Sequence, residues 1–160
     1  DHNQYKKGVQ YDSAVRVPLI VSWPGRLKAG WRDETHLVSG VDIPATLLDY
    51  ASLPALPDMS IARSLRPLLE RRDVPWREMV VSESYAGGPV RSVRTDRYKA
   101  VLFQDGRTRL HDMLKDPLEK TDLSQDPSFA EVLQRHQSLH NEFVSQIKLH
   151  PDYQHFVPVA

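Results

Sequence analysis

Four short β-type segments joined by tight turns constrain the fold of this chain more than any other feature. They cover residues 78–83, 90–94, 97–103 and 108–113. Thr95-Asp96 and Asp105-Gly106 stand between the later segments, and an Asp-Gly pair between apolar runs is a strong hairpin signal. Strands joined by such short turns pair antiparallel with their neighbours in sequence. We therefore predict a four-stranded antiparallel meander.

The stretch after the fourth segment predicts a long helix. Asp126 and Pro127 are typical of a helix start, because aspartate caps the first turn and proline fits into it. Apolar residues then recur at helical spacing and form one stripe, which consists of Phe129, Val132, Leu133, Leu139, Phe143 and Ile147. A sheet with one apolar face must bury that face against another element. We therefore expect this helix to lie across the meander.

The first third of the chain has a different pattern. Residues 15–23, with the sequence VRVPLIVSW, form a nearly continuous apolar run that is typical of a strand covered on both faces. Pro18 suits the start or the edge of such a strand, and Pro24-Gly25 ends it. A helix is predicted to begin at Asp42 and to end at Pro54. Residues 54–75 hold four prolines and only a short helical pattern over 64–70, so we place a lobe boundary there.

Charge and composition exclude several classes of function for this segment. Lys plus Arg and Asp plus Glu both total 21, so no overall field favours nucleic acid or an anionic membrane surface, and neither is expected as a partner. No apolar run approaches the roughly 20 residues that a bilayer-spanning helix needs. The chain has no cysteine, which excludes disulfides, thiolate metal sites and a cysteine nucleophile within it. The cellular compartment stays open.

Five blocks of sequence, in order along the chain, resemble the late part of the sulfatase family. HNQYKKGVQYDSAVRVPLIVSWPG is similar to a family loop that ends in a lysine and a small residue and leads into an RVPLIV-x-WPG strand. LVSGVDIPATLLDYASLP resembles the family's VDLAPTLLDLAGIP helix, and ARSLRPLL resembles GRSLLPLL. VRSVRTDRYKAVLF and RLHDMLKDPLEKTDLS resemble an R-x-VRTDRYKYI hairpin and an LYDLEKDPGETTNLA stretch. The resemblance covers nearly the whole chain.

This resemblance implies an α/β fold, which is α+β within the chain itself. Residues 1–56 would be the C-terminal part of a large α/β lobe of the alkaline-phosphatase type. Residues 57–160 would be a small lobe, with a four-stranded antiparallel sheet packed by a C-terminal helix. The chain would then be the C-terminal fragment of a longer enzyme and would be catalytically incomplete by itself.

The resemblance also places a candidate site residue in the first loop. In the family pattern His-Gly-x-Trp-x-Lys the lysine reaches the sulfate group, and an alignment without gaps puts His2 on the histidine and Lys7 on that lysine. Asn3 and Tyr5 depart from the family's glycine and tryptophan. A lysine ammonium can sit against a sulfate oxygen and offset the charge that grows on the transferred group. Lys7 is therefore the candidate sulfate ligand, Lys6 its alternative, and His2 a residue that lines the site.

Asp1 and His2 form a possible metal pair, because a carboxylate and an imidazole can share a divalent ion. The family's acidic metal-binding pair stands well upstream of the lysine, whereas His2 lies only five residues before Lys7. We therefore expect Asp1 and His2 to belong to the loop or to support the site, and not to bind the metal.

Three further patterns have simpler interpretations. Ser22–Arg26, with the sequence SWPGR, fits the Ser/Cys-x-Pro-x-Arg pattern whose first residue sulfatases convert to formylglycine. Because this segment follows the predicted strand, we interpret it as a turn. His136 and His140 stand four residues apart on the long helix and are interpreted as exposed. Basic residues on the hairpin fit alternation on a half-solvated sheet, although they could also meet an acidic substrate; they are Arg91, Arg94, Arg97 and Lys99.

As the resemblance implies, the whole protein would hydrolyse a sulfate ester or sulfamate of a small molecule or glycan. In the family a formylglycine hydrate attacks sulfur and a divalent cation, usually calcium, polarises the sulfate oxygens. Both are expected upstream of this chain, which is not expected to hold the cation alone. The alternatives are a phosphonate or phosphate ester hydrolase on the same scaffold, and a non-catalytic module that binds acidic glycans. The apolar strand without its neighbours predicts self-association of the fragment.

Overall fold

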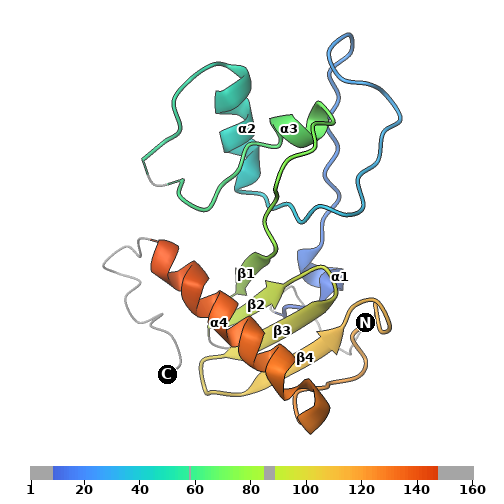
Figure 1. Ribbon diagram of the computed structural model, residues 1–160, viewed down its shortest axis with the longest axis vertical. Helices are drawn as coiled ribbons and strands as arrows, with labels where there is room; N and C mark the ends of the chain where they lie inside the picture. The colour runs from blue at the N-terminus through green and yellow to red at the C-terminus, as the bar shows by residue number, and fades with distance from the viewer. Residues whose placement is uncertain (1–8, 58, 85–88, 148–160) are drawn as a thin grey trace.

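The computed structural model describes residues 9–57, 59–84 and 89–147. Figure 1 shows two parts that are joined by narrow connections. One part is a sheet with the long helix α4 across its front, and the other, above it, holds α2, α3 and long loops. None of the helices in the described ranges combines the length and the apolar character that a bilayer crossing requires.

The sheet is the predicted four-stranded antiparallel meander. Its strands are β1 (Val80–Ser84), β2 (Val90–Arg94), β3 (Tyr98–Phe103) and β4 (Thr108–Asp112), in the order β1-β2-β3-β4. In the centre, Val93 is opposite Ala100, and Ala100 is opposite Leu110. The last hairpin contains Gly106 at a φ of 83°, which only glycine adopts without strain. The predicted turn signals therefore set the topology.

The helix α4 (Ala130–Gln146) follows a single 3₁₀ turn, η1 (Pro127–Phe129). Asp126 caps that turn as predicted, because its carboxylate accepts a hydrogen bond from the Ser128 N–H. The helix packs on β2 and β3 and closes the apolar core of the sheet. This core consists of Val93, Ala100, Leu110 and Leu139, which are all buried.

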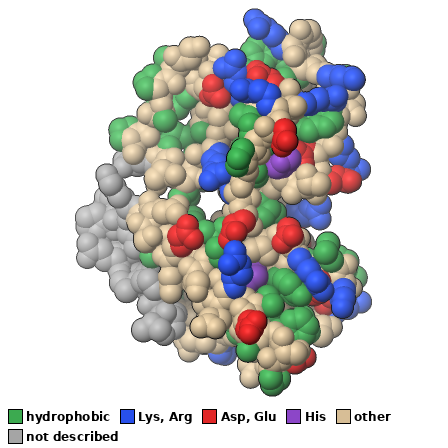
Figure 2. Space-filling model, in the orientation of Figure 1, with side chains coloured by type: hydrophobic (Ala, Val, Ile, Leu, Met, Phe, Trp, Pro, Cys, Tyr) green, Lys and Arg blue, Asp and Glu red, His purple; other side chains and the backbone are tan. Residues whose placement is uncertain are grey.

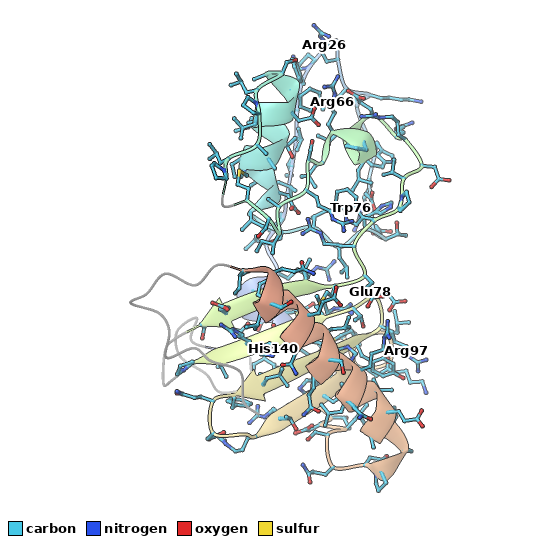
Figure 3. The ribbon with its side chains drawn as sticks, turned by 60° about the vertical axis from the view of Figure 1, so that its left-hand side comes forward. Arg26, Arg66, Trp76, Glu78, Arg97 and His140 are labelled. Atoms are coloured by element: carbon cyan, nitrogen blue, oxygen red, sulfur yellow. The ribbon has the colours of Figure 1, made fainter. Side chains whose placement is uncertain are left out.

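The interpretation of the two helix histidines as exposed is wrong. His136 and His140 are only 2% and 6% exposed, and both lie on the buried face of α4 beside Leu139. Their spacing of four residues puts them on one helix face, and that face is the one pressed against the sheet. The apolar stripe is therefore confirmed, but the buried face of the helix also carries two polar rings, of which Figure 3 labels that of His140 on α4.

The expectation of a half-solvated sheet is also wrong. Lys99 is 1% exposed and Arg91 is buried as well, so the basic residues of the hairpin do not all alternate toward water. Arg91 lies on the face covered by α4, whereas Lys99 lies on the opposite face. That opposite face is covered by residues 10–12 and by the loop that contains Glu119. Each face of the sheet is thus a packing surface.

The upper part contains α2 (Asp42–Tyr50) and α3 (Arg66–Leu69), close to the predicted helices. The helix α2 ends four residues before Pro54, in a turn where Ser52 takes a left-handed φ of 56°. Asp42 is its first residue, and its buried carboxylate accepts hydrogen bonds from the N–H groups of Ser39 and Arg63. Arg77, which leads into β1, forms an ion pair with the same carboxylate at 2.6 Å.

The strand predicted over residues 15–23 is absent. Asp12–Val15 forms the short helix α1, and the chain then runs without strand pairing past Trp23. The side chains of Val17 and Ile20 are 70% and 87% exposed. A strand needs a hydrogen-bonded neighbour, and within the described ranges no segment pairs with this one. The apolar run therefore remains at the surface, and Ile43 and Leu47 of α2 are exposed as well. Figure 2 shows hydrophobic side chains on the surface of the upper part.

Candidate functional site

The face of the sheet opposite α4, which we call the polar face, carries hydrophilic side chains from every strand. They are Ser82, Ser92, Arg94, Lys99, Arg109 and His111. Side chains on one face alternate with those on the other, so this set follows from the observed register. The polar face is covered by residues 10–12, which directly follow the loop of the candidate sulfate ligand. We therefore describe this junction as the candidate functional site.

Gln10 begins the junction. Its side-chain oxygen accepts hydrogen bonds from the hydroxyls of Ser82 and Ser92, at 2.6 and 3.1 Å. These two serines are directly opposite one another on β1 and β2. Gln10 is buried, so its amide bridges the two strands away from bulk water.

Tyr11 and Asp12 continue the junction toward the other two strands. The hydroxyl of Tyr11 accepts a hydrogen bond from Arg109 of β4, and its ring packs against that of His111. The carboxylate of Asp12 lies 2.7 Å from the ammonium nitrogen of Lys99 on β3. Three consecutive residues therefore contact all four strands between them.

Lys99 is the centre of this junction. Its ammonium also lies 2.6 Å from a carboxylate oxygen of Glu119, whose other oxygen accepts a hydrogen bond of 2.6 Å from the Asp12 N–H. Glu119 is buried and holds a left-handed backbone at a φ of 54°, which is uncommon for a residue other than glycine. One lysine and two carboxylates thus tie the start of α1 to β3 and to the loop after β4.

Arg94 adds a further cation at the edge of the junction. Its guanidinium donates to the carbonyl oxygen of Thr95. Burial lowers the pKa of Arg94, and attraction to Asp12 acts in the opposite direction. The like charge of Arg16 also lowers the pKa of Arg94.

The histidines of α4 are fixed in place on the other face of the sheet. Arg91 donates to Nε2 of His140 at 3.2 Å and also pairs with Glu83. Burial lowers the pKa of His140, with Arg91 acting in the same direction. His136 donates from Nδ1 to the carbonyl oxygen of Val132, one turn earlier. Each ring thus has a role in the packing of the helix.

Metal-ligating side chains do not gather in the described part of the chain. Within residues 9–57, 59–84 and 89–147, no group of three or more His, Cys, Asp or Glu side chains could hold an ion. Trp23 begins a turn in which its carbonyl oxygen accepts from the N–H groups of Arg26 and Leu27. Ser22–Arg26 is therefore a turn, as predicted.

The candidate ligands of the first loop, Lys7 and His2, lie outside the described residues, as does Asp1. Their roles stay predictions. The structure does place the residues just after this loop, since Gln10 is the third residue beyond Lys7 and Asp12 the fifth. The junction on the polar face was missed by sequence reasoning. Ser92 and Lys99 are seen to share a face only once the register of β2 and β3 is known.

Two hollows lie between the upper part and the sheet. The larger has a volume of about 500 Å³ and is lined from above by Thr35 and from below by Tyr98. Its two cationic side chains are paired with carboxylates, Arg77 with Asp42 and Arg135 with Glu78. The smaller hollow, of about 190 Å³, adjoins the same ion pairs. Arg63, which also lines the smaller hollow, places its guanidinium over the ring of Trp76.

Known proteins match this chain along nearly its whole length. Residues 1–148 match the family model described as N-sulphoglucosamine sulphohydrolase, C-terminal. An arylsulfatase of Clostridium perfringens is 33% identical over 135 residues, which cover 82% of this chain and 28% of that relative. The chain belongs to the sulfatase family. This finding confirms the resemblance on which the interpretation of the sequence rests.

Solved structures share the fold of this sulfatase chain. A 2-O GAG sulfatase matches with a TM-score of 0.62 and 29% identity, over 74% of this chain and 27% of that one. A phosphonate monoester hydrolase from Silicibacter pomeroyi matches with a TM-score of 0.75 and 26% identity, over 88% and 31%. These matches confirm the predicted fold class. The chain spans less than a third of the length of the relatives named here. The division at residue 56 stays a prediction.

Proposed function

We propose that this chain is the C-terminal portion of an enzyme that hydrolyses a sulfate ester or sulfamate on a glycan. The observation that carries the proposal is the match of residues 1–148 to the C-terminal model of a sulfohydrolase. The glycan substrate rests on the 2-O GAG sulfatase among the structural neighbours. The zero net charge of the chain is consistent with a local anion site and not with a broad basic surface.

Lys7, in this proposal, holds a sulfate oxygen of the substrate, and His2 lines the same site. Formylglycine and a divalent cation, calcium in the usual case, would supply the nucleophile and the polarisation of sulfate from the part of the enzyme upstream. The described residues offer no cluster for that cation. Because the nucleophile and the cation would both come from upstream, we propose that the chain by itself is inactive.

The test replaces Lys7 with alanine in the full-length enzyme. Loss of one preorganised donor to developing charge costs about 100-fold or more in kcat. Lys6→Ala is the matched control, because it removes the same charge from the adjacent position and should leave kcat within a few-fold. Turnover is measured with an aryl sulfate and with a sulfated disaccharide. Unchanged kinetics in Lys7→Ala would remove Lys7 from the site.

A phosphonate or phosphate ester hydrolase is the second candidate, because the phosphonate monoester hydrolase has the same fold over 88% of this chain. Sulfate and phosphate groups present similar tetrahedral oxygens to a lysine. The same enzyme preparation therefore receives an aryl phosphonate monoester beside the aryl sulfate. A value of kcat/KM that is higher for the phosphonate would favour this candidate.

The third alternative, a non-catalytic module that binds acidic glycans, loses much of its support in the structure. Arg91 is buried and paired with Glu83, and Lys99 is buried between two carboxylates. Arg97 is 40% exposed and pairs with Asp112. The hydrogen bond that Arg97 donates lowers the pKa of Asp112. Three of the four basic residues of the hairpin are thus paired with carboxylates, and the fourth, Arg94, donates to the carbonyl oxygen of Thr95.

A further inference from the structure

The junction on the polar face fixes a short segment in two directions at once. Gln10 bonds to β1 and β2, Tyr11 bonds to β4, and Asp12 pairs with β3. Hydrogen bonds to several strands prevent the segment from sliding along the sheet or across it, because each bond tolerates only a narrow range of distance and angle. An apolar contact of the same area would tolerate such shifts far better.

Stability alone does not explain why Lys99 is buried here. Removal of an ammonium and two carboxylates from water costs several kcal/mol per ion, and apolar residues of similar volume often serve stability equally well. Glu119 adds a left-handed backbone, a kind of strain that costs of order 1–3 kcal/mol and persists where the surrounding structure imposes it. Buried ionic groups can instead specify one geometry. The geometry specified here is the path of residues 10–12.

That path fixes the point from which the chain leads back to Lys7, which lies outside the described residues. Lys7 is the third residue before Gln10, and three residues span at most about 11 Å of chain. The position of residues 10–12 therefore limits how far the backbone of Lys7 can lie from the sheet. An error of about 1 Å in the position of a catalytic group can lower the rate by about 100-fold.

We propose that Lys99, with Glu119 and Asp12, is a positioning residue for catalysis: it anchors to the small sheet the segment that delivers Lys7 to the substrate. This inference rests on the proposed function, because it takes Lys7 as the sulfate ligand. It assigns to the small C-terminal sheet a part in turnover, although the sheet itself contributes no reacting group.

The test uses the full-length enzyme and an aryl sulfate. Lys99→Met should lower kcat by at least about tenfold, with KM changed less than about threefold, since a misplaced donor weakens mainly the transition state. Arg77→Met is the matched control: it removes another buried cation whose carboxylate partner, Asp42, lies in the upper part. It should lower the melting temperature as Lys99→Met does, but leave kcat within about twofold. Equal kcat values in the two variants would overturn the proposal.

A double variant separates this inference from the proposed function. If Lys99 acts through Lys7, Lys99→Met should have little further effect on kcat once Lys7 is alanine. Multiplicative losses in the double variant would overturn the positioning role and leave Lys7 in the site. An unchanged kcat in Lys7→Ala alone would instead overturn the proposed role of Lys7.

A milder variant covers the case in which Lys99→Met does not fold. Tyr11→Phe keeps the ring against His111 and removes only the hydroxyl that Arg109 contacts. Because it releases one of the anchors of the same segment, we expect kcat to fall by about threefold, and this loss to vanish when Lys7 is alanine. An unchanged kcat in Tyr11→Phe, in an enzyme where Lys7→Ala is impaired, would count against the proposal.

Discussion

Replacement of Asp42 by alanine should lower the free energy of unfolding of this chain by about 3–5 kcal/mol, which is the usual cost of removing one partner of a buried ion pair. The carboxylate is fully buried, and it accepts from Arg77 at 2.6 Å, from the Arg63 N–H at 2.9 Å and from the Ser39 N–H at 2.8 Å. The guanidinium of Arg77 is only 11% exposed. Alanine would therefore leave a buried cation and two backbone donors without their acceptor.

The measurement is urea unfolding, followed by tryptophan fluorescence. Trp76 is a local probe, because its ring stacks under Arg77 and its N–H donates to the carbonyl oxygen of Leu37. The matched control is Asp49→Ala, which removes the same side chain from the other end of α2. Asp49 pairs with Arg66 at the surface, and exposed pairs contribute little. The urea midpoint should therefore fall much further for Asp42→Ala than for Asp49→Ala.

A double variant tests the physical reason for that difference. If the cost arises from an unpaired buried guanidinium, Asp42→Ala combined with Arg77→Met should be more stable than Asp42→Ala alone. The reasoning would be refuted if Asp42→Ala shifted the midpoint no further than Asp49→Ala does. It would also be refuted if the second substitution only added to the loss.

Two other predictions concern acid stability and self-association. Burial lowers the pKa of His140 below its ordinary value of 6.5, so the unfolded chain binds this proton more tightly and the free energy of unfolding falls as the pH drops below about 6.5. Between about pH 7.5 and pH 5.5, the urea midpoint of His140→Gln should therefore fall less than that of the parent chain. Equal falls would exclude His140 as the cause of the acid destabilisation. The exposed apolar run with Val17 and Ile20 should make the 160-residue chain self-associate in concentrated solution, and Ile20→Lys should reduce this in sedimentation velocity. A parent chain that sediments as a monomer at the highest soluble concentration would contradict this prediction.

The sheet was predictable because its signals are local. The pair Asp105-Gly106 fixes one hairpin, Thr95-Asp96 fixes another, and the bounds of β2 agree with the prediction. Strand alternation then determines both faces once the register is known. The two buried histidines were also within reach of the sequence, because His136 lies four residues after Val132 and His140 lies three residues before Phe143, both at helical spacing. Their residue type suggested exposure, but their position on the apolar stripe indicated burial.

The ion cluster around Lys99 had no such signal. Its carboxylates come from Asp12 and Glu119, which lie 87 residues before it and 20 residues after it. No local pattern of charge or hydropathy connects positions so far apart, since tertiary structure alone brings them together. The apolar run over residues 15–23 shows the opposite case, in which a local signal was present but the predicted strand did not form. Its composition favours a strand, but strand pairing depends on a neighbour, and the described residues provide none.

The two faces of the sheet have different roles: one contributes mainly to the stability of the fold, and the other fixes the position of residues 10–12. The face under α4 combines the apolar residues Val93, Ala100 and Leu110 with the helix, so substitutions there should change the free energy of unfolding before they change any geometry. The polar face holds residues 10–12 by directional bonds to Ser92, Lys99 and Arg109. Substitutions on that face change where a segment lies as well as how firmly it is held. If Lys99 positions Lys7 as proposed, a small domain that carries no reacting group sets the rate of a reaction elsewhere in the enzyme, because Lys7 is only three residues from the segment that the polar face holds.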